Sequence, residues 1–178
     1  MNIILDKGLI IEYYSLLYGI YRMIDEISLK ILNILQEKAR IPNVDVARQV
    51  GLAPSAVLER IRKLEKQGII DGYEVRLNPK QFAKNLVAFV NVTIEQPGDE
   101  IAVGDTLSLI PEVQEVHYVA GDDSFLVKVR VADTEELGRL IRDKITTIES
   151  VHSTRTGIVL STYKETAKIP IDTLAIGK

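Results

Sequence analysis

The spacing of hydrophobic residues changes near Pro79, and this change most constrains what the chain can fold into. Before it, Ile27, Ile31 and Ile34 recur at the three- and four-residue intervals of an amphipathic helix. After it, Phe125 begins a run with an apolar residue at every second position, as in a strand with one buried face. The chain is therefore predicted to be an α+β protein with two domains joined by a short hinge.

The helical half predicts a winged helix-turn-helix. Its helices are expected over about residues 25–41, 43–51 and 54–66. Asn43 is the expected N-cap of the second helix, and Gly51 is expected to close it with a positive φ. The following "IIDGYEVRLNP" predicts a hairpin, because Asp71 and Gly72 form a turn signal between apolar ends.

The second half predicts the order β-α-β-β-α-β of a ferredoxin-like unit. Asp133 with Glu136 resembles a capping box that opens its second helix. The strands are expected over "LVAFVNVTIE", "VQEVHYVA", Phe125–Val131 and "VHSTRTGIVLSTYKE", and the first helix over "GDEIAVGDTLSLI". The second helix is expected to turn four apolar residues inward, namely Leu137, Leu140, Ile141 and Ile145.

These signals predict five segments along the chain. They are an N-terminal extension over 1–22, a winged helix-turn-helix over 23–76, a hinge over 77–84, a ferredoxin-like domain over 85–166 and a tail over 167–178. The apolar stretches of the extension are too short to span a bilayer, and no small-residue cleavage site follows them. We therefore expect either that Met23 is the natural start or that residues 1–22 form an added arm that packs on a neighbour.

Charge is distributed unevenly although the net charge is only -3. From Met23 to Lys80 the chain carries 10 Lys and Arg against 8 Asp and Glu, and from Gln81 to Lys178 it carries 10 against 15. The first half is therefore the better candidate for an anionic partner. The chain has no cysteine, which excludes disulfides and thiolate metal sites and fits a cytoplasmic protein. The lack of Cys and Trp beside abundant Glu and Lys favours an archaeal or thermophilic source.

The third helix carries the residues expected to meet double-stranded DNA. Its buried face is set by Val57, Ile61 and Leu64, and a solvated outer face is the competing interpretation. A preceding short helix and glycine turn, with small residues at the start of the third helix, favour DNA. Four residues are expected to read bases, namely Ser55, Ala56, Glu59 and Arg60. The remaining expected DNA contacts are Arg62, Lys63 and Lys66 on phosphates, Arg76 on the wing, and Asn43.

The run from "IDEISLKILNIL" to "IIDGYEVRLNP", followed by the βαββαβ half, resembles the Lrp/AsnC (feast/famine) family of transcriptional regulators. The resemblance extends from Met23 to about Glu165. It implies a winged DNA-binding domain and a ligand-sensing domain that dimerises through its sheet, often assembling further into tetramers or octamers. One departure is Ala53, where members commonly carry a serine that caps the recognition helix.

The same resemblance implies an effector site for a small amino acid or related amine. In "VAGDDSFLV" the glycine permits close approach of a ligand and two aspartates could bind an ammonium group, although these are also ordinary turn residues. Threonines on the last strand could meet a carboxylate or simply stabilise the sheet. The expected effector contacts are Gly121, Asp122, Asp123, Ser124, Thr154 and Thr156. Ser124 stands where many members of the family carry an aspartate. The chain is therefore expected either to bind a different effector or to have lost control by a ligand.

No motif of an enzyme is present, and no cofactor is expected. His117 and His152 lie far apart in sequence without metal-ligand spacing, so no metal site is expected either. Two alternatives to a ligand-responsive regulator remain. One is an architectural protein that coats DNA without an effector. The other is an enzyme similar to the sirohaem decarboxylases, which resemble this family in both halves.

Overall fold

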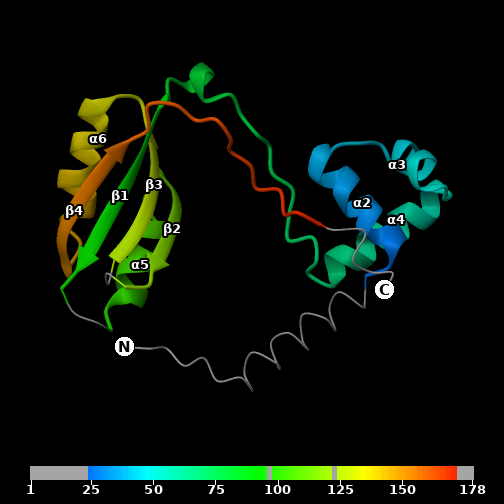
Figure 1. The fold of residues 1–178 in the computed structure, drawn as a ribbon, viewed down its shortest axis with the longest axis horizontal. Coiled ribbons are helices and arrows are strands. Elements are labelled where there is room, and N and C mark those ends of the chain that lie inside the picture. Colours follow the sequence, from blue (N-terminus) through cyan, green and yellow to red (C-terminus); the bar gives the residue numbers. More distant parts are fainter. Residues whose placement is uncertain (1–23, 96–97, 122–123, 172–178) are drawn as a thin grey trace. The chain divides into compact units, whose positions relative to one another are not determined.

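The computed structural model describes residues 24–95, 98–121 and 124–171 (Figure 1). Within these ranges the chain forms two compact units, one of residues 24–75 with 166–171 and one of residues 76–165. The chain therefore passes between the units twice, after Val75 and again after Glu165. The expected extension over residues 1–22 lies outside the described residues.

Three helices make up the first unit: α2 (Glu26–Glu37), α3 (Asn43–Val50) and α4 (Pro54–Lys66). They confirm the three expected helices, although α2 ends a few residues earlier than expected. Their apolar faces meet in two clusters of buried residues, which hold α4 against its neighbours. One cluster contains Ile31, Leu35, Val46, Ala47, Val57 and Ile61, and the other contains Leu29, Leu32 and Leu64.

The ends of these helices differ in part from expectation. Asp25 caps α2, because its Oδ1 accepts a hydrogen bond from the Ser28 N–H at 2.7 Å. The expected cap at Asn43 is wrong: Asn43 is the first residue of α3, and no side chain caps that helix. Pro42 takes the cap position because its backbone, with φ -59° and ψ 139°, is already extended. Gly51 closes α3 with φ 72°, as predicted.

The predicted hairpin after α4 is wrong for this chain, because residues 69–78 form no strand. A type I′ turn needs a positive φ at both of its central residues, and Gly72 has none. Instead α4 closes on Gly68 at φ 67°, and the next two isoleucines donate back to the Leu64 carbonyl at 2.9 and 3.3 Å. After them the chain leaves the core, and an isolated hairpin with no packed face is marginal in water.

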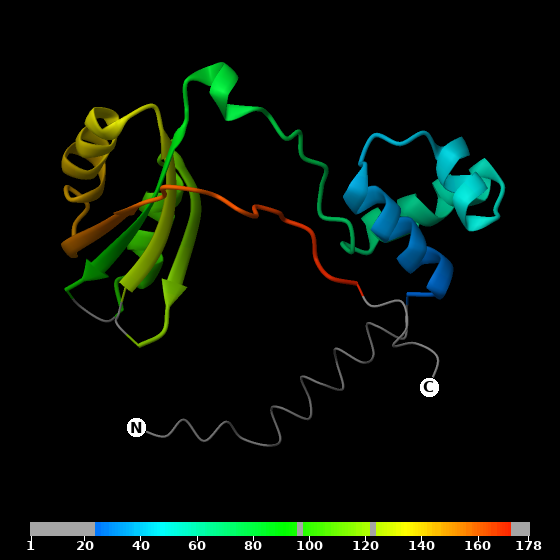
Figure 2. The same ribbon diagram turned by 45° about the horizontal axis from the view of Figure 1, so that its top comes forward.

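The second unit is a four-stranded antiparallel sheet in the order β2-β3-β1-β4, with two helices on one face (Figure 2). A 3₁₀ turn, η1 (Pro79–Phe82), precedes it. The elements are β1 (Leu86–Ile94), α5 (Glu100–Ser108), β2 (Val113–Val119), β3 (Ser124–Val131), α6 (Thr134–Leu140) with a π-helical turn η2 (Ile141–Ile145), and β4 (Val151–Ile158). This order confirms the predicted βαββαβ arrangement.

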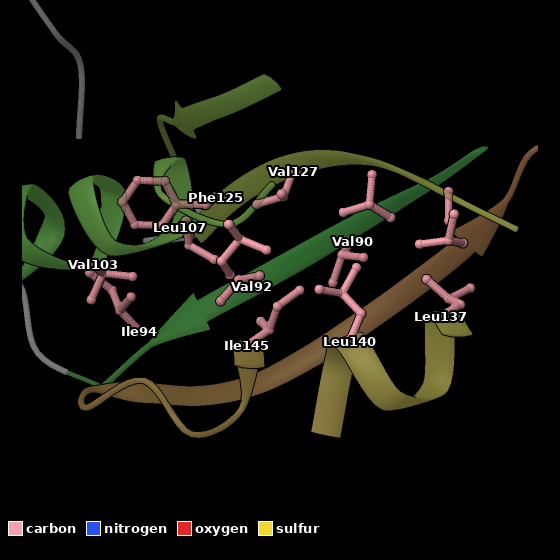
Figure 3. Close-up of a cluster of buried hydrophobic side chains, with 14 residues drawn as sticks. Val90, Val92, Ile94, Val103, Leu107, Phe125, Val127, Leu137, Leu140 and Ile145 are labelled. Atoms are coloured by element: carbon pink, nitrogen blue, oxygen red, sulfur yellow. The ribbon is translucent and has the colours of Figure 1, made fainter. Parts of the chain in front are cut away.

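The core of this unit lies between the sheet and its helices (Figure 3). Val90 of β1 and Val127 of β3 face Leu107 of α5 and Leu140 of α6 there. The alternation predicted for β3 is confirmed, since every second residue from Phe125 is buried.

The capping box at α6 is confirmed, but the Glu136 side chain bonds the backbone one residue earlier than expected. Asp133 Oδ1 accepts from the Glu136 N–H at 2.8 Å, and Glu136 Oε2 accepts from the Ala132 N–H at 2.6 Å rather than from Asp133.

The opposite, helix-free face of the sheet carries the alternate residues. Phe89, Asn91, Leu126 and Lys128 pair across β1 and β3 on this open face. Ser124, at the start of β3, shares their side of the sheet. No helix in the described ranges is long and apolar enough to cross a membrane.

Candidate nucleic-acid interface and ligand site

Helix α4 presents a polar face opposite its buried stripe. Val57, Ile61 and Leu64 are buried, as predicted, whereas the polar residues opposite them are exposed, with Arg60 partly buried at the flank. Of the residues expected on the outer face, all five are exposed: Ser55, Glu59, Arg62, Lys63 and Lys66. Within the described part of the chain none of the last three forms an ion pair. Cations without carboxylate partners on one helix face are suited to bind phosphates.

Arg60 differs from the other cations of α4, because it is held by α2. Its Nη1 pairs with the Asp25 carboxylate and donates to the Ser28 hydroxyl at 3.1 Å. Burial raises the pKa of Asp25, but the bonds from Arg60 and Ser28 outweigh it and hold that pKa below its ordinary value. This pairing holds the Arg60 side chain at the first turn of α2. For Arg60 to bind a guanine, the base would have to compete with the Asp25 carboxylate for the guanidinium group. The sequence contained no signal for this pair, whose members are 35 positions apart.

The three remaining expected DNA contacts lie off the exposed face of α4. Ala56 is half-buried beside the exposed face, and Asn43 is half-buried at the start of α3. Arg76 falls in the second unit, where the hydrogen bond from Lys128 is the main cause of the lowered pKa of Glu165 and the charge of Arg76 makes the smallest contribution. Without the hairpin, the expected wing contact of Arg76 has no structural support in this chain.

Ser124 lies at the turn expected to bind an effector, and it is almost completely buried, at 1% exposure. Its hydroxyl accepts a hydrogen bond from Asn91 Nδ2 at 3.2 Å. Gly121, before the turn, has φ 114°, a conformation that favours glycine. Asp122 and Asp123 lie outside the described residues. Sequence reasoning missed Asn91, because its partner comes from a strand 33 positions away.

The two threonines expected at the effector site lie on the other side of the sheet. Thr154 pairs with Val92 and Thr156 with Val90, and both valines point into the helix-covered core. Ser124 belongs to the open face instead. Because residues on one strand alternate between faces, a single chain does not bring Ser124 and these threonines into one site.

The open face carries a set of ion pairs that the sequence did not indicate. Lys128 Nζ pairs with Glu115 at 2.8 Å and with Glu165, and Arg130 lies 3.4 Å from Glu165. Burial lowers the pKa of Lys128, but the two carboxylates outweigh it and the net pKa is raised. Beside these pairs is a groove of about 330 Å³ between Phe89 and the residues that follow β4. Glu165 therefore fastens the chain after β4 to the sheet.

The histidines do not converge on a metal site in the described chain. His117 Nε2 lies 3.4 Å from Glu115, and His152 Nδ1 lies 3.6 Å from Glu95. No group of three or more His, Cys, Asp and Glu residues in the described ranges is placed to hold a metal ion.

Comparison with known proteins assigns both units to families. Residues 24–71 match the winged helix-turn-helix DNA-binding family, and residues 87–169 match the Lrp/AsnC ligand binding domain. The chain is 37% identical over 147 residues to the leucine-responsive regulatory protein of Haemophilus influenzae, covering 82% of this chain and 89% of that protein.

Two solved structures extend the comparison. A transcriptional regulator of Neisseria meningitidis in complex with L-methionine has a TM-score of 0.78 and 28% identity, covering 82% of this chain and 96% of that one. A feast or famine regulatory protein of Mycobacterium tuberculosis, also complexed with L-methionine, has a TM-score of 0.74 and 34% identity, covering 82% of this chain and 98% of that one.

Proposed function

This chain belongs to the Lrp/AsnC family of transcriptional regulators, and from that membership we propose how its own residues read DNA and sense a ligand. It is a DNA-binding regulator with a ligand-binding domain. We propose that it acts as a homo-oligomer. We propose that a dimer places α4 of each subunit in the major groove of a roughly palindromic site in the cytoplasm. The two half-sites then lie about one helical turn, or a multiple of it, apart. No residue is assigned a catalytic role.

The exposed face of α4 is the single observation that carries this proposal. Three of its cations form no ion pair with any described residue and are suited to phosphates. The exposed Ser55 and Glu59 precede them, at the end of the helix that enters a groove first. Glu59 would accept a hydrogen bond from a cytosine amino group. The proposed base readers are Ser55, Ala56 and Glu59, and the proposed phosphate contacts are Arg62, Lys63 and Lys66. Arg60 reads a base only if DNA displaces Asp25.

We propose that a small amino acid or related amine is the effector and binds near Gly121 and Ser124. Two relatives were solved with L-methionine, which supports an amino acid as the class. The buried Ser124 hydroxyl and Asn91 amide form a polar pair beside the turn, where a ligand could be hydrogen-bonded. If Thr154 or Thr156 also contacts the ligand, a second subunit must supply it, because one chain places them across the sheet.

A gel-shift titration tests the proposal directly. The DNA upstream of the protein's own gene is titrated with the full chain against random competitor DNA, with amino acids added singly, starting with L-methionine and L-leucine. A complex that survives the competitor and changes with one amino acid supports a ligand-responsive regulator. Equal affinity for random DNA would contradict sequence-specific regulation and favour the architectural alternative.

A further inference from the structure

The segment after β4 ends on helix α2 of the DNA-binding unit, and its attachment is specific. Gln36 of α2 bonds the backbone of Ile169 twice: the Ile169 N–H donates to Oε1 at 2.7 Å, and Nε2 donates to the Ile169 carbonyl at 3.1 Å. Lys168 pairs with Glu37 at 2.6 Å. Ile171 packs against the buried cluster that contains Leu64 of α4. We call these four residues, 168–171, the α2 anchor.

A second anchor lies just before the first one in the chain. Glu165 is held on the sheet of the ligand-binding unit by Lys128 and Arg130 of β3. Only Thr166 and Ala167 separate Glu165 from the α2 anchor. Two residues of extended chain have little slack, since each spans at most about 3.6 Å. A shift of β3 that moves Glu165 is therefore transmitted to α2.

We propose that residues 165–171 form a strap that couples the ligand-binding sheet to the helix that seats α4. This inference rests on the proposed function, because the signal that the strap would carry is the binding of the proposed effector. β3 begins at Ser124, beside the proposed effector turn, and carries Lys128 and Arg130 on the same open face. At the other end, Ile171 touches the cluster formed by residues of α2 and α4. The strap is thus a second link between the units, besides the crossing of the chain after Val75.

Each contact makes a different contribution to the strap. The Lys168–Glu37 pair is exposed on both sides, so on its own it contributes little. The paired hydrogen bonds from Gln36 fix the register of the segment, because an amide side chain that bonds both the N–H and the carbonyl of one residue admits one alignment. Ile171 adds apolar contact with the core. Gln36 and Ile171 are therefore the positions to change.

Docking of the strap is tested in the full chain by zero-length carbodiimide cross-linking between Glu37 and Lys168, followed by peptide mass spectrometry. We expect this cross-link in the wild type and a severalfold lower yield in Gln36→Ala and in Ile171→Asp. The control is Lys164→Gln, because Lys164 is exposed, forms no ion pair in the described chain and should leave the yield unchanged. An unchanged yield in both test variants would overturn the docking. So would a cross-link that joins only isotopically labelled to unlabelled chains in a mixed sample.

Coupling is tested by measuring DNA affinity with and without L-methionine or the amino acid found active in the gel shift. Allosteric effectors typically change affinity by about 5- to 150-fold. In Gln36→Ala and Ile171→Asp we expect the amino acid to bind unchanged, whereas its effect on DNA affinity falls by about half or more on a logarithmic scale. Gln81→Ala, at an exposed glutamine of η1, is the matched control.

The two proposals fail in different ways. A wild-type chain with no specific DNA binding or no ligand response contradicts the proposed function and, with it, the signal assigned to the strap. A responsive wild type whose Gln36→Ala variant responds equally contradicts the strap alone.

Discussion

Replacing Lys63 by alanine should reduce the salt dependence of DNA binding without changing sequence preference. Lys63 is exposed on the outer face of α4 beside Arg62, and both lack an ion-pair partner in the described chain. With Lys66 they give three candidate phosphate contacts for each subunit, which makes about six for a dimer and a slope of log K against log salt of about -5. Such a protein loses about a thousandfold in affinity between about 50 and 200 mM salt.

The variant removes two of these contacts from a dimer, so the slope should become shallower by about 2. Fluorescence anisotropy with a labelled specific duplex at four or more salt concentrations measures this slope. The same titration with random DNA should show the same decrease, because phosphate contacts carry no sequence information.

Lys80→Ala is the matched control, since Lys80 is an exposed lysine of η1, away from α4 in the sequence. Its slope should equal that of the wild type. If Lys63→Ala keeps the wild-type slope, or if it weakens specific binding but leaves random DNA unaffected, the assignment of this face to phosphates is refuted.

Three further changes test the local structure around the sites. Asp25→Ala should lower the free energy of unfolding by about 1 kcal/mol through loss of the α2 cap, whereas Asp25→Asn keeps a cap and should lose less, as measured by denaturant unfolding followed by circular dichroism. Because the pKa of Asp25 is lowered on folding, its contribution is present above the unfolded value of about 3.9 and is lost as pH falls through the folded value; Asp25→Asn should therefore lose less stability on acidification over that range. Gly51→Ala forces a side chain into φ 72° and should cost about 1 to 2 kcal/mol in the same assay, so an unchanged stability would contradict the positive φ. Ser124→Ala leaves the Asn91 amide without its acceptor and should cost about 1 kcal/mol, whereas a neutral result would show that this bond is not formed in solution.

Local hydrophobic patterns predicted the helices and strands. They did not predict contacts between residues that lie far apart in the sequence. β3 was predictable because Phe125 and every second residue after it are apolar. A strand that buries only one of its faces has an apolar residue at every second position. The stripe of α4 followed in the same way from Val57, Ile61 and Leu64. The prediction of a hairpin failed, because a turn signal at Gly72 has no effect unless the flanking segments have an apolar face to bury.

The candidate site shows the same difference between features set by local sequence and features set by long-range contacts. Exposure of Arg62, Lys63 and Lys66 follows from helical periodicity, so the sequence placed these three cations correctly. The pairing of Arg60 with Asp25 and the bonding of Gln36 to Ile169 depend on helices and loops brought together only in the folded chain, 35 and 133 positions apart. The same is true of the effector residues: Ser124 and Thr154 were both expected at the effector site, but the register of the strands places them on opposite faces of the sheet.

Helix α2 has two attachments that bear on how a signal could reach DNA. Its first turn holds Arg60 of α4 through Asp25 and Ser28. Its last turn holds the strap through Gln36 and Glu37. A helix of 12 residues is stiff over its length of about 18 Å, so a displacement at the last turn moves the first turn as well. In that case Arg60 need not touch a base to affect recognition. By joining α4 to α2, it would make the orientation of the proposed base-reading residues depend on where the proposed strap holds α2.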